Sequence, residues 1–208
     1  MHLKNYGLYI VKELTLIPGM KRGEIQSPEA GDLLISEPFL QDENFVRSVV
    51  LLCEHNKEGS FGLVINKPSI LKLSELIEEL AFLEKEVFVG GPVEQNTLHF
   101  IYLGDKQLEG SISLGKNLWW GGDFEILVSK LKTGLLDPDS IRFFLGYSGW
   151  GEGQLKEELD GKTWIICRSE IDLHTFEYTP EELWRNLLKN MGGEFMVIAN
   201  YPLDPRLN

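Results

Sequence analysis

Short apolar runs rich in β-branched and aromatic residues recur along the chain from residue 31 onward, and Gly, Pro, Asn and Asp separate them. This alternation is typical of β-strands joined by turns. The turn-like segment at residues 55–59 lies between two such runs and predicts a hairpin, so we expect a sheet that is not purely parallel. The predicted strands are residues 33–35, 48–53, 61–65, 87–89, 98–103, 141–145, 164–167 and 195–199.

Three segments carry apolar residues at the spacing of a helix instead. In residues 72–85 these residues fall on one face, and acidic residues fall on the other. Asp123 can cap a second helix. The third helix begins with a capping box between Thr179 and Glu182, and its apolar stripe favours core packing over a cofactor site.

Length and composition are those of one folded domain. The chain has 208 residues, of which 43% are hydrophobic and 25% charged, and this is enough apolar surface for a core. Prolines and a glycine interrupt the first part of the chain and argue against a long helix there. We therefore expect an N-terminal arm over residues 1–28 and a single domain over residues 29–208.

The charge balance narrows the classes of partner. Lys and Arg total 20 against 32 Asp and Glu, which gives a net charge of −12. Nucleic-acid affinity comes mainly from cations that neutralise phosphates, so direct nucleic-acid binding is not expected. No apolar stretch is long enough for a membrane helix and no signal-peptide core is found, so we expect a cytoplasmic protein that does not bind membranes.

The cysteines and histidines show no metal-binding pattern. Cys53 and Cys167 are far apart and each lies in an apolar run, so both are interpreted as buried reduced thiols. The 4 histidines lack the spacing of metal ligands. We expect no disulfide, no metal site and no cofactor.

The segment of residues 146–150 places Ser148 after a predicted strand and before a predicted helix, as in a nucleophile elbow. Trp150 stands where that pattern requires glycine. An aspartate and a histidine follow in the order of a catalytic triad, but a triad is defined by geometry and any chain of this length contains such an order. The sequence therefore does not favour a serine hydrolase.

Gly149 and Gly151 precede a predicted helix, where backbone amides could converge on an anion. The dinucleotide-binding pattern is not met, because Gln154 stands in place of its last glycine, and Glu152 would repel a phosphate. The favoured interpretation is that the glycines permit a tight turn and that Trp150 packs the loop onto the core. An anion or small-ligand site on this loop is the alternative.

Polar residues lie at the ends of two runs that are predicted to pair. His55 ends one run and Asn66 and Lys67 follow the next, so we expect them to meet on one rim of the sheet, joined by Arg47. Turn chemistry is the simpler explanation, because Asn and Pro serve turns for backbone reasons. If this rim and the loop of residues 148–154 form one pocket, the protein is an enzyme or a small-ligand-binding protein.

Two adjacent tryptophans, Trp119 and Trp120, precede a pair of glycines. Such a pair suits either core packing or an exposed contact patch. Core packing is the favoured interpretation.

Several motifs follow one another in a fixed order and spacing. They are GDLLISEP from residue 31, FVRSVVLLCEH from residue 45, GLVINKP from residue 62, GGPV from residue 90, LGYSGWGEGQL from residue 145 and GKTW from residue 161. Together they resemble the YqgE/AlgH family of bacterial proteins over about residues 30–190. The resemblance implies a compact single α+β domain with a largely antiparallel, barrel-like sheet surrounded by helices.

The resemblance also implies a role in transcriptional regulation, and it brings no reaction and no catalytic residues. The chain offers no convincing helix-turn-helix and is strongly acidic, so we expect such a role to act through a protein partner. The leading hypothesis is a non-enzymatic binding or regulatory protein, and the sequence leaves its oligomeric state open. The candidate ligand-binding residues are Arg47, His55, Asn66, Lys67, Ser148, Gly149, Trp150, Gly151 and Gln154.

Overall fold

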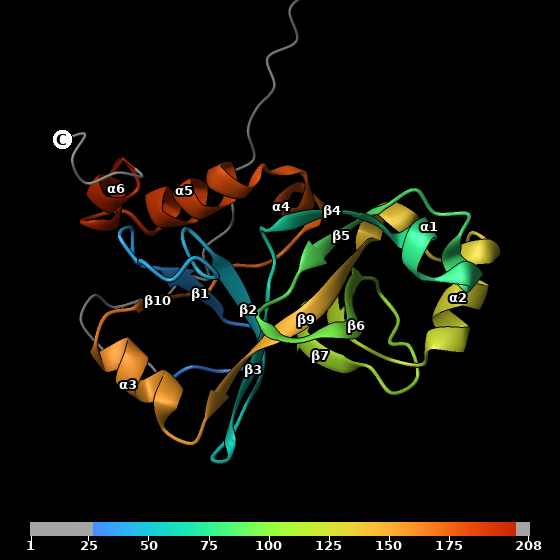
Figure 1. The fold of residues 1–208 in the computed structure, drawn as a ribbon, viewed down its shortest axis with the longest axis horizontal. Coiled ribbons are helices and arrows are strands. Elements are labelled where there is room, and N and C mark those ends of the chain that lie inside the picture. Colours follow the sequence, from blue (N-terminus) through green and yellow to red (C-terminus); the bar gives the residue numbers. More distant parts are fainter. Residues whose placement is uncertain (1–26, 203–208) are drawn as a thin grey trace, which may run out of the picture.

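The computed structural model describes residues 27–202, so the arm expected over residues 1–28 lies almost entirely outside the described residues. Figure 1 shows how the strands and helices are arranged. The strands are β1 (Leu33–Ser36), β2 (Val49–His55), β3 (Gly59–Val64), β4 (Pro68–Lys72), β5 (Glu86–Val89), β6 (Val93–Leu103), β7 (Ile112–Gly115), β8 (Leu118–Trp120), β9 (Ile141–Gly151) and β10 (Trp164–Cys167). The helices are α1 (Leu73–Leu76), α2 (Phe124–Lys132), α3 (Gln154–Asp160), α4 (Leu173–Glu177), α5 (Pro180–Met191) and α6 (Phe195–Ile198), with two 3₁₀ turns, η1 (Glu78–Leu80) and η2 (Pro138–Ser140).

The strands form one largely antiparallel sheet. Its order is β10-β1-β2-β3-β9-β6-β8-β7, and β5, which carries β4, pairs with β9. Among the described strands, only β5 and β9 pair in parallel. The predicted α+β class and the largely antiparallel sheet are confirmed. The sheet is open and not a closed barrel, because its end strands β10 and β7 do not pair with each other in the described part of the chain.

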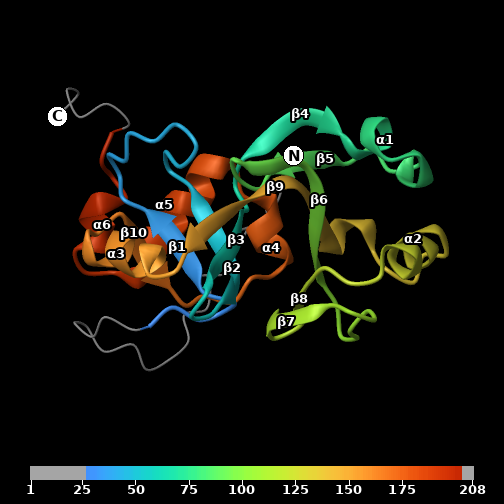
Figure 2. The same ribbon diagram turned by 60° about the horizontal axis from the view of Figure 1, so that its bottom comes forward.

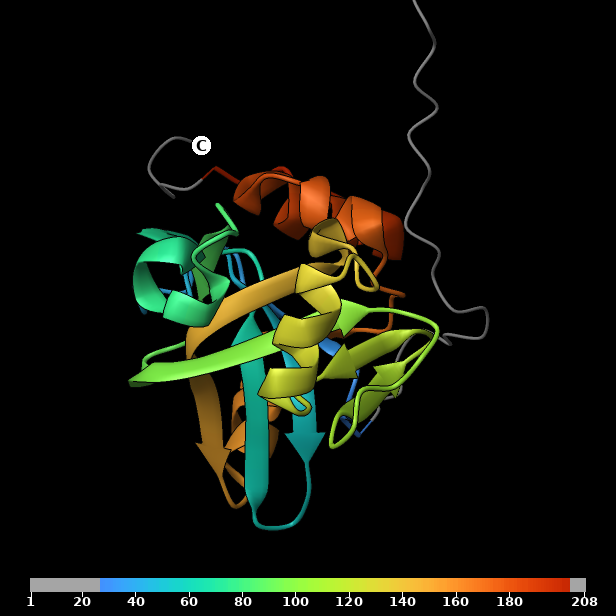
Figure 3. The same ribbon diagram turned by 90° about the vertical axis from the view of Figure 1, so that its right-hand side faces the viewer.

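Strand β9 joins the two halves of the molecule. Its first part pairs with β5 and β6, and its last part pairs with β3. Figure 2 shows β1, β10, α3 and α6 on one side of β9 and β7, β8 and α2 on the other. One core packs α5 against β1, β2 and β3, and α5 lies across one end of these strands (Figure 3). A second core packs α2 against β6 and β9.

Backbones touch where β9 passes the residues that lead into β6. Gly146 has a φ of 68°, which residues with side chains rarely adopt. A Cβ on Gly91 would lie 2.2 Å from the carbonyl oxygen of Tyr147, and a Cβ on Gly90 would lie 2.3 Å from that of Gly146. Glycine is required at these positions because no side chain fits between the strands.

The predicted helix over residues 72–85 is wrong in length. The chain forms only the short helix α1 and the 3₁₀ turn η1, separated by Ile77 in an extended conformation with φ −130° and ψ 111°. The apolar spacing still serves the core, since Leu73 and Leu80 are buried. Two successive single turns bury residues at nearly the same spacing as one helix, so periodicity alone did not distinguish them.

The last predicted strand is the helix α6. Phe195, Ile198 and Ala199 pack against the core, whereas Met196 and Val197 are exposed. This i, i+3, i+4 pattern is helical, but a run this short does not separate strand from helix by periodicity. The helix forms because this arrangement lets its apolar side pack beside α5.

Other sequence predictions are confirmed. The side chain of Asp123 caps α2, and Thr179 and Glu182 form the capping box of α5. The β2–β3 hairpin forms, and Cys53 and Cys167 are buried free thiols. No helix within residues 27–202 is long and apolar enough to cross a membrane.

Candidate ligand-binding site

The tip of the β2–β3 hairpin lies beside the end of β9 and brings two predicted parts of the site together. His55 pairs with Ser60, and Ser60 pairs in turn with Trp150. A cavity of about 490 Å³ opens beside these strands. It is lined by Glu54, Asn56, Glu58, Gly59, Ser60, Phe61, Val93, Tyr147, Gly149 and Trp150.

Asn66 and Lys67 do not join this cavity. The register pairs Val50 with Val64, so the residues that follow β3 lie beside the start of β2, whereas His55 lies at its end. The expectation that His55 and Asn66 share one rim is therefore wrong. The strands do pair, but in an antiparallel hairpin the end of one strand lies opposite the start of the next.

Asn66 binds backbone groups instead. Its Oδ1 accepts a hydrogen bond from the N–H of Val49 at 2.8 Å, and its Nδ2 donates to the carbonyl oxygens of Arg47 and Pro180 at 2.9 and 3.0 Å. The side chain is buried. It ties the start of β2 to the first turn of α5 and satisfies polar groups that would otherwise be buried without partners.

Arg47 is the buried cation of the same region. Its side chain is 4% exposed, and it donates to the carboxylate of Glu181 at 2.6 Å. It also donates to the carbonyl oxygen of Tyr201, and its guanidinium lies 4.5 Å from the ring centroid of Trp184. Arg47 and Asn66 are called the polar hub below.

Lys67 lies next to the polar hub. Its Nζ donates to the carbonyl oxygens of Glu43 and Asn44 at 2.9 and 2.6 Å. Burial lowers the pKa of Lys67 from its usual value, and the charge of Asp42 partly offsets that effect. Lys67 lines a separate cavity of about 350 Å³ and does not line the cavity beside Gly149 and Trp150.

Ser148 is not placed as a nucleophile. Strand β9 continues through Gly151, and Ser148 is fully buried with its hydroxyl donating to the carbonyl oxygen of Gly90 at 3.1 Å. The helix predicted after residues 146–150 is confirmed as α3, but the strand continues through these residues, so they do not form the sharp turn of a nucleophile elbow. The glycine at the start of this motif serves the close crossing of strands and not a sharp turn.

The glycine-rich turn before α3 is closed by side chains of α3. The N–H of Gly151 donates to Oε1 of Gln154 at 3.1 Å, and Nε2 of Gln154 donates to Glu158 at 2.9 Å. Glu158 also accepts the indole N–H groups of Trp150 and Trp164, at 2.8 and 2.7 Å. Trp150 is buried in a core cluster, so its predicted packing role is confirmed.

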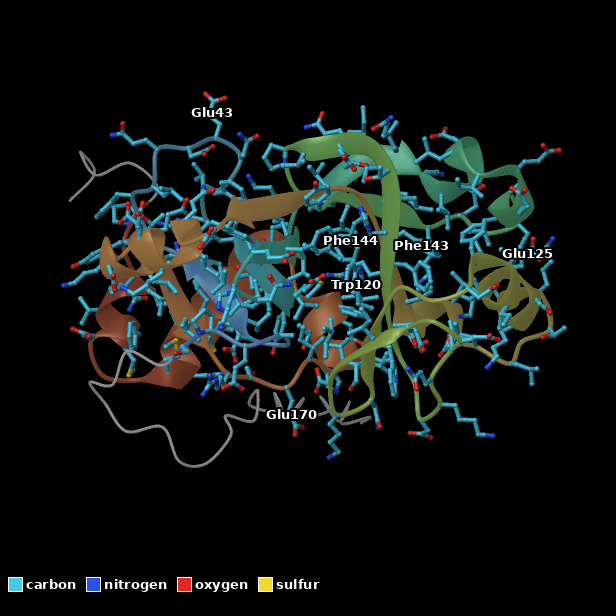
Figure 4. The ribbon with its side chains drawn as sticks, turned by 90° about the horizontal axis from the view of Figure 1, so that it is seen from below. Glu43, Trp120, Glu125, Phe143, Phe144 and Glu170 are labelled. Atoms are coloured by element: carbon cyan, nitrogen blue, oxygen red, sulfur yellow. The ribbon has the colours of Figure 1, made fainter. Side chains whose placement is uncertain are left out.

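Four half-buried aromatic rings, one each from β3, β6, β8 and β9, contact one another beside the cavity; Phe61, His99, Trp120 and Tyr147 are called the aromatic cluster. Phe61 lies in the middle, stacked on Trp120 at 4.7 Å and on Tyr147 at 4.6 Å between ring centroids. His99 meets the Phe61 ring edge-on at 5.2 Å. In Figure 4, Trp120 lies near the middle of the face seen from below, between the two halves of the molecule.

The aromatic cluster holds two polar groups without internal partners. Of the 5 tryptophans, all but Trp120 donate the indole N–H within the protein. Within residues 27–202, the indole N–H of Trp120 and the hydroxyl of Tyr147 have no hydrogen-bond partner, and neither is among the buried unpaired groups, so both reach solvent. Half-buried Trp and Tyr with free polar ends are typical of binding surfaces.

The two adjacent tryptophans therefore differ. Trp119 donates to the carbonyl oxygen of Gly104 at 2.8 Å and stacks against Tyr102 in the second core. The predicted core role is confirmed for Trp119. Trp120 packs on the edge of the first core through Phe61 and turns its polar end outward.

His99 is the titratable member of the aromatic cluster. Its Nε2 lies 3.1 Å from Oγ1 of Thr97. Burial lowers the pKa of His99 from its usual value of 6.5, and the charge of Glu94 offsets this only in part. The ring is therefore neutral at physiological pH and contributes an aromatic surface without a charge.

Carboxylates border the cavity. Glu54 accepts a hydrogen bond from Nδ2 of Asn56 at 2.7 Å, and the carboxylate of Glu58 has no partner among the described residues. Nδ1 of His55 lies 2.7 Å from Oγ of Ser60 on the exposed hairpin. No second group within residues 27–202 orients the His55 ring, so the pair lacks the third member of an activated nucleophile.

No group of His, Cys, Asp and Glu side chains in the described part of the chain is arranged to hold a metal ion. The cavity offers aromatic stacking, the free hydroxyl of Tyr147 and negative charge at its border, and the free indole N–H of Trp120 lies in the adjoining aromatic cluster. These properties suit recognition of another molecule.

Sequence reasoning found one side of this site and missed the other. Gly149 and Trp150 were predicted as candidates and line the cavity. Phe61, His99 and Tyr147 were not predicted as site residues. Their meeting depends on the order of β3, β9 and β6, which local patterns do not encode. One signal was available, since Phe61, Trp120 and Tyr147 each stand next to a glycine in the sequence.

The chain has clear relatives. Residues 33–196 match the family model described as AlgH-like. A UPF0301 protein of Cytophaga hutchinsonii is 48% identical over 179 residues, which cover 86% of this chain and 98% of that protein. A UPF0301 protein of Chlorobium limicola is 37% identical over 185 residues, which cover 89% and 98% of the two chains.

Two solved structures share the fold. The solution structure of the AlgH protein from Pseudomonas aeruginosa matches with a TM-score of 0.63 and 27% identity, over 86% of this chain and 98% of that one. The crystal structure of protein DIP2367 from Corynebacterium diphtheriae matches with a TM-score of 0.72 and 19% identity, over 88% and 95%. The second likeness concerns the fold alone.

Proposed function

The chain belongs to the AlgH-like family, and we propose that it acts by binding a protein partner and not by catalysing a reaction. In this proposal the partner contacts the aromatic cluster and the cavity beside it. The observation that carries the proposal is the stack of Trp120, Phe61 and Tyr147, which is half-buried and presents two free hydrogen-bonding groups to solvent.

Physical reasons support this choice of site. Trp and Tyr are enriched among the residues that dominate binding energy at protein interfaces. Rings that already stack on one another lose little conformational freedom on binding, so contact with them is favourable. The described candidates for a nucleophile are poorly placed. Ser148 is buried, and the hydroxyl of Ser60 contacts His55, whose ring is not oriented by a further group among the described residues.

The cellular role is part of the proposal. We assign the protein to transcriptional regulation in the cytoplasm, through its partner. Its net charge of −12 disfavours direct contact with nucleic acid, and its two free buried thiols suit a reducing compartment.

An enzyme or small-ligand site in the same cavity is the second candidate. The contact between His55 and Ser60 at 2.7 Å is the observation in its favour. Labelling with a fluorophosphonate probe separates the two candidates. Covalent modification of Ser60 would favour the enzyme, and an unmodified protein favours the binding role.

The test of the proposal is capture of partners by the tagged protein at physiological salt, with nuclease present, using wild type, Trp120→Ala and Phe82→Ala. Phe82 is 48% exposed and lies outside the aromatic cluster, so it is the matched control for loss of an aromatic ring. We expect a partner that survives nuclease, is lost with Trp120→Ala and is kept with Phe82→Ala. Equal capture by all three proteins would contradict the proposal.

A further inference from the structure

The border of the cavity limits the chemistry of its occupant; this inference rests on the proposed function. Glu54 and Glu58 line the cavity, and the carboxylate of Glu58 has no partner within the described residues. Lys57 stands between them in the hairpin turn but does not line the cavity. An anionic group would be repelled here, whereas a cation would be attracted by the border and by the net charge of −12.

The wall of the cavity is aromatic. Phe61 and Tyr147 line it, and the face of an aromatic ring attracts cations. Phe61 stacks on one face of the Tyr147 ring. Gly149 also lines the cavity, and a Cβ there would lie 3.1 Å from Cε2 of Tyr147, so the missing side chain leaves room beside that ring. The cavity thus combines a ring, a neighbouring carboxylate and room between them.

We propose that this cavity binds an arginine side chain from a basic segment of the partner protein. A guanidinium is planar, so it can stack on the Tyr147 ring while its in-plane N–H groups donate to the carboxylates of Glu54 and Glu58. A lysine ammonium satisfies the charge but not the stacking. The recognised chemistry is therefore an exposed arginine flanked by residues small enough to let it enter.

The direct test is fluorescence anisotropy with a short labelled peptide of arginine, glycine and serine. Peptides of equal length in which lysine or glutamate replaces arginine are the comparison. We expect the arginine peptide to bind about tenfold more tightly than the lysine peptide. The glutamate peptide is expected not to bind. Binding of the arginine peptide should weaken as salt is raised, because the cavity border is charged.

Two glycine variants form a matched pair. Gly149→Ala places a methyl group against Tyr147, whereas a Cβ on Gly151 meets only Oε1 of Gln154 at 4.0 Å and lies outside the cavity lining. We expect Gly149→Ala to weaken arginine-peptide binding by about tenfold or more and Gly151→Ala to leave it unchanged. Unchanged thermal unfolding of both variants shows that the fold is intact.

Charge variants form a second pair. Glu58→Gln is expected to weaken binding of the arginine peptide by about threefold to tenfold, and Lys57→Gln is expected not to weaken it. Equal binding of arginine and lysine peptides, or equal effects of Gly149→Ala and Gly151→Ala, would overturn the inference.

The failure of this inference can be told apart from failure of the proposed function. If Trp120→Ala abolishes capture of the partner but the arginine peptide does not bind, the choice of arginine is overturned and the binding role stands. If Trp120→Ala leaves capture unchanged, the proposed function fails and this inference fails with it.

Discussion

At one end of the β2–β3 hairpin, the polar hub directs charged and amide groups toward the protein's own backbone and α5, whereas at the other end the aromatic cluster presents free hydrogen-bonding groups to solvent. Arg47 and Asn66 have the residue types expected of a binding site, yet both are buried and hydrogen-bonded inside the protein. Phe61 and Tyr147 have the residue types expected of a core, yet both line a cavity. Partners and exposure therefore identify a binding site better than residue type does.

This difference predicts that the polar hub determines stability and the aromatic cluster determines binding. Buried polar groups are costly when their partners are removed, because the groups left behind stay desolvated. Truncating a half-exposed ring lowers the free energy of unfolding by less, because part of the ring is already in contact with water. The following variants separate the two effects.

Arg47→Ala is expected to have the largest effect on stability. It removes the hydrogen bonds to Glu181 and Tyr201 and the packing on Trp184. Glu181 keeps its ion pair with Arg185, so the main cost is the cavity left beside Trp184. We expect a loss of about 3–4 kcal/mol in the free energy of unfolding. Denaturant unfolding measures it, and a loss below about 1 kcal/mol would contradict the structural role of the hub.

Asn66→Ala comes next. It leaves the N–H of Val49 and the carbonyl oxygens of Arg47 and Pro180 without their amide partner. We expect a loss of about 2–3 kcal/mol in the free energy of unfolding. Partner binding per folded molecule should match wild type, and a specific loss of binding in folded protein would move the site to this end of the hairpin.

Trp119→Ala and Trp120→Ala compare neighbouring residues of the same type. Trp119→Ala should cost about 1 kcal/mol more in unfolding free energy, because it also removes an internal hydrogen bond to Gly104. Only Trp120→Ala should abolish partner capture. The reverse assignment, with binding lost through Trp119→Ala in a folded protein, would exclude the aromatic cluster as the site.

His99 is expected to have the smallest effect on stability, and this effect is a dependence of the free energy of unfolding on pH. Its pKa in the folded state is lowered below 6.5, so the unfolded state takes up the proton first as pH falls. The contribution of neutral His99 to the free energy of unfolding is therefore fully present above pH 6.5. It declines as the pH falls from there through the folded-state pKa. Thermal unfolding of wild type and His99→Phe between about pH 8 and pH 5 measures it. The exposed His174→Gln is the control, and a parallel decline in wild type and His99→Phe would contradict the prediction.

The sequence predicted what local chemistry decides. The caps at Asp123 and Thr179, the β2–β3 hairpin and the buried cysteines follow from nearby residues. The predicted helix over residues 72–85 is wrong because Ile77 is extended and interrupts it. The predicted strand over residues 195–199 is wrong because packing against α5 favours a helix there.

The same distinction holds for the candidate site: residues within one local motif were predicted, and contacts between distant strands were not. Gly149 and Trp150 were found through their motif and line the cavity. The prediction that His55 and Asn66 share a rim is wrong because it ignored the direction of the strands. In the hairpin, the end of β2 lies opposite the start of β3, so the two residues are at opposite ends. The contact of Phe61 with Trp120 joins β3 to β8, which are distant in the sequence and brought together by the sheet order.

The most direct test of the central claim is hydrogen exchange and chemical-shift mapping of the 5 tryptophan indole N–H groups by NMR. The indole groups of Trp119, Trp150, Trp164 and Trp184 donate to internal acceptors, and that of Trp120 reaches solvent. We predict fast exchange for the Trp120 indole alone, and a shift of its signal when the partner or the arginine peptide is added. A protected Trp120 indole, or a response confined to Trp184 beside the polar hub, would contradict the account.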